Sequence, residues 1–357
     1  MQRSIPCVLM RGGTSRGPYF LASDLPADPV RRDAVLLRVM GSPHELQVDG
    51  IGGSNTLTSK VAIVSRSQHE GADVDYLFAQ VSVNEAFVDT KPNCGNMLAG
   101  VGPFAIEAGL VRAGDPTTTV RIYNVNTETL IHAVIQTPGG RVEYAGDTRI
   151  DGVADPAAPI KLTFLDAFGA VTGKLLPTGK PLDVIDGIEA SCIDMAMPVM
   201  ILAAEALGKT GGERPQDLDA DRTMMQRIEA LRLEAGRLMG MGDVSKLVVP
   251  KPVLVSRPAQ GGNIRARYFT PHACHKSHAV TGALAVGTAA VLPGTVAARF
   301  LEPKGFSGGM LGIEHPSGRI DVDLVVDRSG TVERASFVRT ARRILEGVVY
   351  VPEGLFG

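Results

Sequence analysis

The chain has 357 residues, of which 36 are Lys or Arg and 38 are Asp or Glu, for a formal net charge of −2. Its basic residues are evenly spread, without the stripe that neutralises phosphates, so nucleic acid is excluded as an expected partner. With 44% hydrophobic residues and this length, we expect two domains. The expected boundaries are 1–180, which could also include the C-terminal strand, and 181–357.

No apolar stretch is long enough to cross a bilayer, and the N-terminus lacks the pattern of a secretion signal. We therefore expect a cytoplasmic protein without a membrane partner. Its four cysteines are scattered and form no CxxC pair. This spacing predicts reduced thiols, with neither a disulfide framework nor a zinc site.

Short runs rich in β-branched residues and separated by turn-forming residues predict strands in antiparallel or mixed sheets. Turn signals at RPAQGGNI and HPSGRI predict hairpins. In chain order, the expected strands are 5–10, 60–65, 74–83, 86–90, 119–125, 130–137, 141–146, 251–256, 264–269, 319–326 and 333–338.

Four segments predict helices. The first comprises residues 30–40. Asp28 supplies its cap, Pro29 is the first-turn proline, and Gly41 ends the helix. Residues 220–242 carry apolar side chains three or four apart and predict an amphipathic surface helix. Residues 96–111 contain one charge and 279–294 contain none, which predicts a buried helix in each domain. Their similar composition suggests an internal duplication.

Cys94 lies in NCGN, directly before the first apolar helix. The unpaired N–H groups of a helix start favour an anion, so this thiol could be an acid or a base. A small buried thiol is the alternative. Lys60 begins an apolar strand and is either a lysine that reaches water or a desolvated base.

Two polar segments could bind anions. RGGTSRG contains Thr14 and Ser15 in a glycine-rich turn but lacks the spacing of a nucleotide phosphate loop. The second segment precedes the other apolar helix, and its three histidines lack the further ligand that a zinc site needs. Carboxylate binding at the helix start is the simpler expectation. The candidates there are Arg267, His272, His275 and Ser277.

The chain resembles the PrpF-type isomerases, most of all the branch that acts on 4-oxalomesaconate. The resemblance rests on MRGGTSRGPYFL, GIGGSNTLTSKVAIV, NCGNMLAGVGPFAIEAGLV, YAGDTRIDG, MGDVSKLVVPKP, IEHPSGRIDV and FVRTARRILEGVVYVP in this order. It implies the α+β, diaminopimelate-epimerase-like fold, in which two pseudo-symmetric domains each curl a mixed sheet around a central buried helix. The active site would lie in the cleft between the domains.

The same resemblance implies chemistry. Lys60 would be the base and Cys94 the thiol on the other face of the substrate, with no cofactor and no metal. Thr14, Ser15 and the polar residues before each helix would bind a small polycarboxylate. A homodimer is one candidate assembly, which the sequence does not decide. These polar residues are Asn93, Gly95 and Asn96 in the first half, with Arg267, His272, His275 and Ser277 in the second.

Some positions depart from the family pattern. The epimerases have a second cysteine before the second helix, where this chain reads SHAVTGA, so a two-thiol racemisation is not expected. The expected reaction is a 1,3-allylic proton transfer or tautomerisation of 4-oxalomesaconate in aromatic acid (gallate or protocatechuate) degradation. The alternatives are an aconitate or 2-methylaconitate Δ-isomerase, and a non-catalytic binding protein with the same fold.

Overall fold

The computed structural model describes residues 1–91, 93–165, 167–270, 272–306, 308–327 and 332–356. The chain forms two compact units. Unit 1 contains Met1–Leu162 and Arg339–Gly357, and unit 2 contains Thr163–Val338. The C-terminal segment therefore returns to the unit in which the chain begins.

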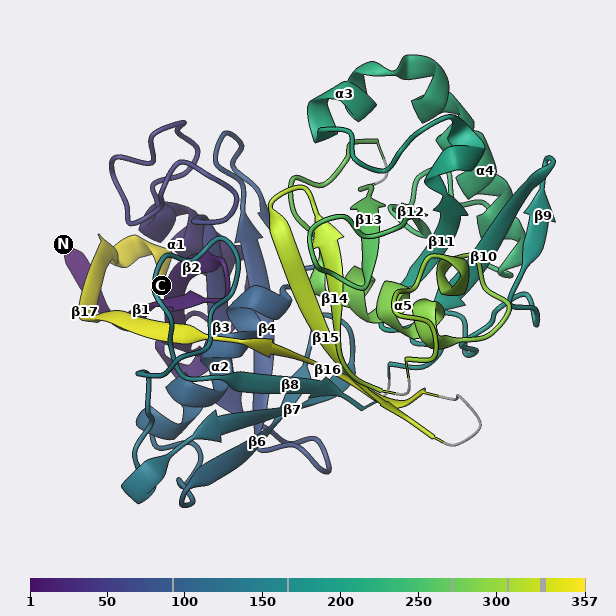
Figure 1. Cartoon of the computed structure of the whole chain (residues 1–357). Coiled ribbons are helices and arrows are strands. Elements are labelled where there is room, and N and C mark those ends of the chain that lie inside the picture. Colours follow the sequence, from purple (N-terminus) through teal and green to yellow (C-terminus); the bar gives the residue numbers. More distant parts are fainter. Residues whose placement is uncertain (92, 166, 271, 307, 328–331, 357) are drawn as a thin grey trace. The chain divides into compact units, whose positions relative to one another are not determined.

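The strands of unit 1 form a mixed sheet (Figure 1). Strands β2 and β3 are parallel, as are β4 and β6, and the other recorded pairs in this unit are antiparallel. In order of pairing the strands are β17 (Ala341–Pro352), β1 (Gln2–Gly12), β2 (Ser15–Leu21), β3 (Lys60–Arg66), β4 (Val74–Val81), β6 (Thr117–Asn124) and β7 (Thr129–Gln136), with β5 (Val88–Asp89) also on β4.

Helix α2 (Gly95–Glu107) is the buried centre of unit 1. It packs against β1, β2, β3, β4, β6, β7 and β17, so the sheet curls around it. Helix α1 (Pro29–Met40) covers the other face of the central strands. Alternation along β2 shows the two layers: Tyr19 reaches α2, whereas Phe20 joins the apolar cluster beneath α1.

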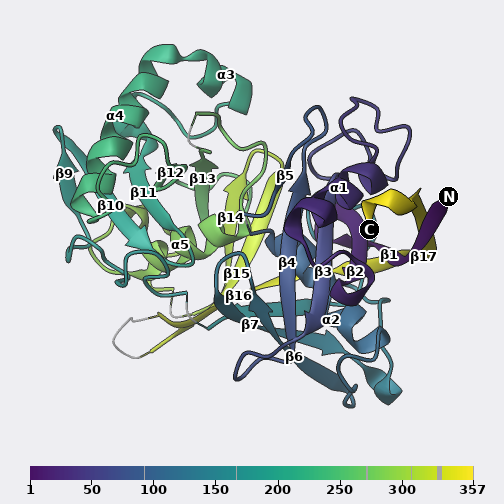
Figure 2. The same cartoon turned by 180° about the vertical axis from the view of Figure 1, so that it is seen from behind.

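Unit 2 repeats this plan with its own mixed sheet (Figure 2). Strands β11 and β12 are parallel, as are β13 and β14, and the other recorded pairs are antiparallel. In order of pairing the strands are β9 (Asp183–Ile185), β10 (Ile188–Asp194), β11 (Pro198–Ala203), β12 (Lys251–Ser256), β13 (Ile264–Tyr268), β14 (Gly309–His315), β15 (Gly318–Val326) and β16 (Val332–Arg339). Strand β8 (Ile160–Phe164) spans the division between the units.

Helix α5 (Val280–Val291) is the buried centre of unit 2 and packs against β10, β11, β13, β14 and β15. Helices α3 (Pro215–Ala220) and α4 (Arg222–Leu238) cover the other face. Each unit therefore curls a mixed sheet around a central buried helix, which confirms the predicted fold class. Short 3₁₀ turns complete the elements at Ala22–Asp24, Pro138–Gly140, Ala204–Leu207, Ala297–Arg299 and Glu353–Leu355.

All four expected helices form, and so do ten of the expected strands. The predicted strand at 141–146 is wrong. Its backbone makes isolated hydrogen bonds, from Glu143 N–H to Gln136 and from Ala158 N–H to Tyr144, and no ladder. The Tyr144 hydroxyl donates instead to Glu107 at the end of α2 over 3.0 Å.

Candidate active site

Lys60 is the first residue of β3, and its side chain is held inside unit 1. The residue is 9% exposed. Its Nζ donates to Oε1 of Gln80, directly opposite on β4, over 2.5 Å and lies 5.0 Å from the centre of the Phe78 ring. Gln80 is fixed in turn, because its Nε2 donates to the Ser59 carbonyl over 2.8 Å. The amine is thus positioned by a neutral amide instead of a carboxylate.

Cys94 is the N-cap residue of α2, and its side chain makes no capping hydrogen bond to this helix. The first-turn N–H groups and the positive end of the helix dipole therefore favour an anion at this point. Of the four cysteines, Cys94 alone is partly exposed. Burial raises the pKa of Cys7, and it raises that of Cys192 and Cys274 to about 12, so these three remain thiols.

Two buried tyrosines hold the first turn of α2. The Tyr76 hydroxyl donates to the Cys94 carbonyl over 3.3 Å, and the Tyr19 hydroxyl donates to the Met97 carbonyl over 2.5 Å. Burial raises the pKa of both phenols well above the usual value, and a negative charge on Cys94 adds to the effect. Both phenols therefore stay protonated and keep donating. Tyr76 lies on the same α2-facing side of β4 as Phe78 and Gln80, which places Lys60 and Cys94 against one face of the sheet.

The turn between β1 and β2 is fastened to the start of α2. The Asn96 side chain donates from Nδ2 to Thr14 Oγ1 over 3.0 Å and accepts at Oδ1 from Arg339 Nε over 3.3 Å. Gly13 has a φ of 52°, and a Cβ there would collide with Asn96. The turn therefore requires glycine for its conformation and for its close approach to the helix.

Three polar atoms beside this turn and the helix start are buried without a hydrogen-bond partner among the described residues. They are Ser15 Oγ, Arg16 Nε and Asn93 Oδ1. An unpaired buried polar atom costs about 1–3 kcal/mol, and a bound polar ligand would supply the missing partners. These atoms therefore make the surroundings of Lys60 and Cys94 a candidate binding site.

A pocket of about 630 Å³ opens within unit 1 beside the same turn. Thr14, Ser15 and Arg16 line it, together with the guanidinium-bearing Arg11 and Arg342. Three arginines give this pocket a positive charge, and charge-assisted hydrogen bonds from arginine suit carboxylates.

In unit 2 the polar segment before α5 is folded around Tyr268. The His275 N–H donates to the Tyr268 carbonyl over 2.7 Å, and the Ser277 N–H donates to His275 Nδ1 over 3.0 Å. The His278 ring lies 5.0 Å from the Tyr268 ring. His275 and Ser277 are therefore brought together at the start of α5, whereas His272 is exposed.

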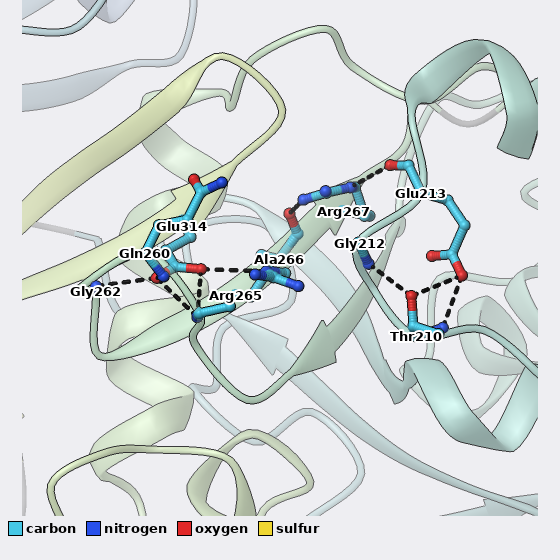
Figure 3. A network of polar contacts seen from close by, with 10 residues as sticks. Thr210, Gly212, Glu213, Gln260, Gly262, Arg265, Ala266, Arg267 and Glu314 are labelled. Atoms are coloured by element: carbon cyan, nitrogen blue, oxygen red, sulfur yellow. Dashed lines mark hydrogen bonds and ion pairs between the residues drawn. The ribbon is translucent and has the colours of Figure 1, made fainter.

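Arg267 lies on the opposite face of β13 from Tyr268, because successive residues of a strand point to opposite faces. Its Nε donates to the Glu213 carbonyl over 2.9 Å (Figure 3). The structure thus places Arg267 on the α3 and α4 side of the sheet, away from His275 and Ser277.

Glu314 stabilises the connection between β12 and β13 (Figure 3). It contacts Arg265, which lies two residues before Arg267 on β13. Glu314 is 2% exposed. Its carboxylate accepts from the N–H groups of Ala259, Gln260 and Gly262 and from Arg265 Nε. Burial alone would raise the pKa of this carboxyl, but these hydrogen bonds outweigh burial and lower it. The glutamate is therefore an ionised anchor of the loop.

Sequence reasoning missed Gln80 and Tyr76, which position Lys60 and Cys94. Gln80 could have been noticed as a polar residue on the inward-facing side of an apolar strand. Within the described ranges, no cluster of three or more His, Cys, Asp or Glu residues is arranged to hold a metal ion. None of the helices in the described part of the chain is long and apolar enough to cross a membrane.

The chain matches the family model described as PrpF protein over residues 2–352. It belongs to the PrpF family. It is 56% identical over 351 residues to the putative isomerase YbhH of Escherichia coli (strain K12), covering 98% of this chain and 100% of that protein. It is also similar to a 4-oxalomesaconate tautomerase of Pseudomonas putida, with 51% identity and coverage of 100% and 98%. A (4E)-oxalomesaconate Delta-isomerase of a Novosphingobium species is 50% identical, with 98% of each chain covered.

Solved structures agree with this membership. A methylitaconate-delta-isomerase superposes with a TM-score of 0.89 at 39% identity, over 100% of this chain and 97% of that one. A probable proline racemase from Agrobacterium radiobacter K84 superposes with a TM-score of 0.54 at 15% identity, over 98% and 93% of the two chains, which concerns the fold alone. The PrpF-family chain has the diaminopimelate-epimerase-like fold, and it is an isomerase.

Proposed function

We propose that this PrpF-family isomerase interconverts isomers of 4-oxalomesaconate by allylic proton transfer in the breakdown of aromatic acids, with Lys60 as the base and Cys94 as the acid. One observation carries the proposal: an amine and an accessible thiol lie beside an uncapped helix start, among buried polar atoms that lack partners. The names of two relatives at about half identity support the substrate.

The proposed reaction needs one proton removed and one added. The neutral amine of Lys60 takes a proton from the carbon next to a carboxylate or keto group, and the electron pair of the broken C–H bond enters a dienolate. The Cys94 thiol then gives a proton to the carbon at the far end of the allylic system. Proton exchange through water restores the amine and the thiol. A positioned acid or base contributes about 10²–10⁴-fold to such a step.

The dienolate carries negative charge while it exists. Uncapped N–H groups at the start of α2 and the arginines of the neighbouring pocket offer it stabilisation without rearrangement. Thr14, Ser15, Asn93, Gly95 and Asn96 are proposed to bind the substrate around this point. Arg267, His272, His275 and Ser277 of unit 2 remain proposed carboxylate ligands.

The nearest alternative is an aconitate or 2-methylaconitate Δ-isomerase with the same two groups. Proton NMR in heavy water distinguishes them when the enzyme is incubated separately with 4-oxalomesaconate, cis- and trans-aconitate, and 2-methylaconitate. We expect rapid deuterium entry into 4-oxalomesaconate and slow or no entry into the others. Faster exchange on an aconitate would assign the alternative, and exchange on none would refute the proposed reaction class.

The base assignment is tested by Lys60→Met. We expect a loss of about 10³-fold or more in kcat, with circular dichroism and the melting temperature close to those of the wild type. Lys180→Met, at an exposed lysine, is the matched control and should retain full activity. Full turnover by Lys60→Met would remove lysine from the mechanism while leaving the isomerase activity in place.

We also propose that the protein is cytoplasmic and forms a homodimer. Strand β17 exposes Ile344, Leu345, Val348 and Tyr350, and an exposed apolar strand is suited to burial against a second copy. Light scattering after size-exclusion chromatography should give twice the chain mass of 37.6 kDa. A mass of one chain at micromolar concentration would reject the dimer.

A further inference from the structure

Lys251 occupies in unit 2 the strand position that Lys60 occupies in unit 1. Strand β3 is parallel to β2 and antiparallel to β4, and β12 is likewise parallel to β11 and antiparallel to β13. Lys60 opens β3 with the sequence KVAIVS, and Lys251 opens β12 with KPVLVS. The mechanism proposed above uses the first lysine and gives the second no role.

The register places Lys251 on the side of β12 that faces α5. Lys251 shares a face with Val253, which pairs with Tyr268, and a Cβ at Gly282 of α5 would collide with the Tyr268 ring. On the parallel neighbour, Val199 lies beside Lys251. Two residues earlier, Met197 contacts the Thr281 hydroxyl in the first turn of α5. Lys251 therefore lies between two contacts with the beginning of α5.

The Lys251 side chain has no polar partner within the described part of the chain. It is 8% exposed, and no hydrogen bond or ion pair joins its ammonium to any residue in the described ranges. Lys60 bonds to Gln80, but the corresponding residue opposite Lys251 is Thr270, whose hydroxyl donates to the Ala273 carbonyl. Burying an ammonium without a hydrogen-bond partner costs free energy, so we expect a bound ligand to supply that partner.

The charges around Lys251 leave the site positive. The charged side chain acting on it is Arg232 of α4, whose guanidinium is bound to both carboxylate oxygens of Glu229. Val199 and Thr270 contribute no charge, and α5 contains no ionisable residue. Burial and Arg232 lower the pKa of Lys251 to about 8, so the side chain is mainly an ammonium at neutral pH.

The beginning of α5 adds to this positive site. Its N-cap is Ala279, which has no side chain that could cap the helix, and no hydrogen bond from a first-turn N–H group to a side chain is found among the described residues. Uncapped N–H groups and the helix dipole favour a negative charge at this point. Lys251 is at least nine-tenths buried and the helix start is open. Both features favour the same kind of ligand, an anion.

We propose that Lys251 binds a carboxylate group of the substrate at the start of α5. This inference rests on the proposed function, since it assigns a second carboxylate-binding point for a polycarboxylate. Lys251 takes no part in moving the proton, so it governs affinity and the choice between substrates with different numbers of carboxylates.

Substitution by methionine, which keeps the length and removes the charge, tests this assignment. Lys251→Met should raise KM for 4-oxalomesaconate about 10- to 100-fold, the effect of one buried charge-assisted hydrogen bond, with kcat within about threefold. Lys251→Arg should recover most of the affinity. Lys246→Met, at an exposed lysine of the preceding loop, is the control and should change neither constant.

Two further measurements separate binding from structure. The melting temperature of Lys251→Met should equal or exceed that of the wild type, because an unpaired buried charge is removed; Lys251→Gln replaces it if the methionine variant does not fold. In the wild type KM should rise above about pH 8 as the ammonium loses its proton, and in Lys251→Arg it should not. An unchanged KM in Lys251→Met, or a loss confined to kcat, would overturn the assignment.

Calorimetry with tricarballylate, a saturated tricarboxylate that cannot isomerise, makes the test independent of turnover. The wild type should bind it about 10- to 100-fold more tightly than Lys251→Met. Equal affinity in the two proteins would reject the carboxylate site. A wild type that binds tricarballylate through Lys251 but does not turn over 4-oxalomesaconate would contradict the proposed function alone.

Discussion

The two central helices share a scaffold but begin with different chemistry. Both α2 and α5 are buried, and neither N-cap residue makes a side-chain capping hydrogen bond. The covering helices α1 and α4, in contrast, are capped by Asp28 and Asp221. At the N-cap, α2 has Cys94 where α5 has Ala279. The repeated fold thus keeps two open helix starts, while only the one in unit 1 has a thiol at its N-cap.

Lys60 and Lys251, the first residues of β3 and β12, also differ in their surroundings. Lys60 is fixed by the side-chain amide of Gln80, whereas Lys251 has a hydroxyl residue opposite and no polar partner among the described residues. A fixed amine beside a thiol suits proton transfer, and a free ammonium beside a helix start suits anion binding. Duplicated geometry can therefore serve two different steps of one reaction.

Among the tests of this comparison, the largest expected effect concerns the two N-caps. Cys94→Ala should lower kcat about 10²–10³-fold, since the acid is lost, and Cys94→Ser should lose less because a hydroxyl can still donate. Steady-state kinetics on 4-oxalomesaconate measure both. Ala279→Cys places a thiol at the second helix start and should not rescue Cys94→Ala. Rescue would show that the two helix starts are interchangeable.

The close approach of each central helix to a tyrosine is the next test. A Cβ would collide with Tyr19 at Gly100 and with Tyr268 at Gly282. Gly100→Ala and Gly282→Ala should each destabilise the protein by about 1–3 kcal/mol, less the gain in helix propensity. Urea unfolding at pH 7 measures this. Gly347→Ala, where a Cβ meets nothing within 4 Å, is the control. Destabilisation by only one of the two substitutions would contradict the structural equivalence of α2 and α5.

Gln80 should matter less than the lysine that it positions. Gln80→Leu removes the acceptor for Lys60 and leaves the amine in place, so we expect kcat to fall about tenfold, the size of one hydrogen bond. Gln80→Glu tests charge at constant shape: a carboxylate beside Lys60 should favour the ammonium, so the limb of the pH profile on which kcat rises should move to higher pH. An unshifted profile would show that Lys60 is not the group that titrates.

The smallest effects are expected at the two capped helices. Asp28→Ala and Asp221→Ala remove acceptors for the N–H groups of Arg31 and Met224. Each should cost about 1 kcal/mol, read from the midpoint of urea unfolding, with kcat and KM unchanged. Asp28→Asn and Asp221→Asn should restore most of the loss. A fall in activity would mean that the covering helices act on the site.

Much of the fold follows from local patterns. Runs of β-branched residues between turn-forming residues predicted most strands, the Asp28 cap and Gly41 delimited α1, and the nearly charge-free compositions of α2 and α5 predicted buried helices. Segment 141–146 was predicted on the same grounds but forms no ladder, because no neighbouring strand pairs with it. Strand β17 was missed because Arg342, Arg343 and Glu346 interrupt its pattern. Pairing with β1, which lies at the other end of the sequence, makes it a strand.

The site residues were harder to predict from the sequence than the fold was. Spacing could not select Lys60 or Cys94, and the family resemblance named both. Their partial burial, the amide of Gln80 and the exposure of one cysteine among four depend on contacts that are distant in sequence. Arg267 and Tyr268 are adjacent, so strand alternation could have separated their faces in advance. The substrate role of Arg267 stays a prediction, as do those of His272, His275 and Ser277.

Strand β17 also has a consequence for biosynthesis. Residues 341–352 pair with β1 along its whole length, from Gln2 with Pro352 to Gly12 with Ala341. On the ribosome, β1 therefore lacks one neighbour until all of residues 163–338 have emerged. Unit 2 has no such wait and can fold while unit 1 is incomplete. The nascent chain thus carries an open sheet edge through most of its synthesis, a stage at which chaperone binding would prevent pairing between neighbouring chains.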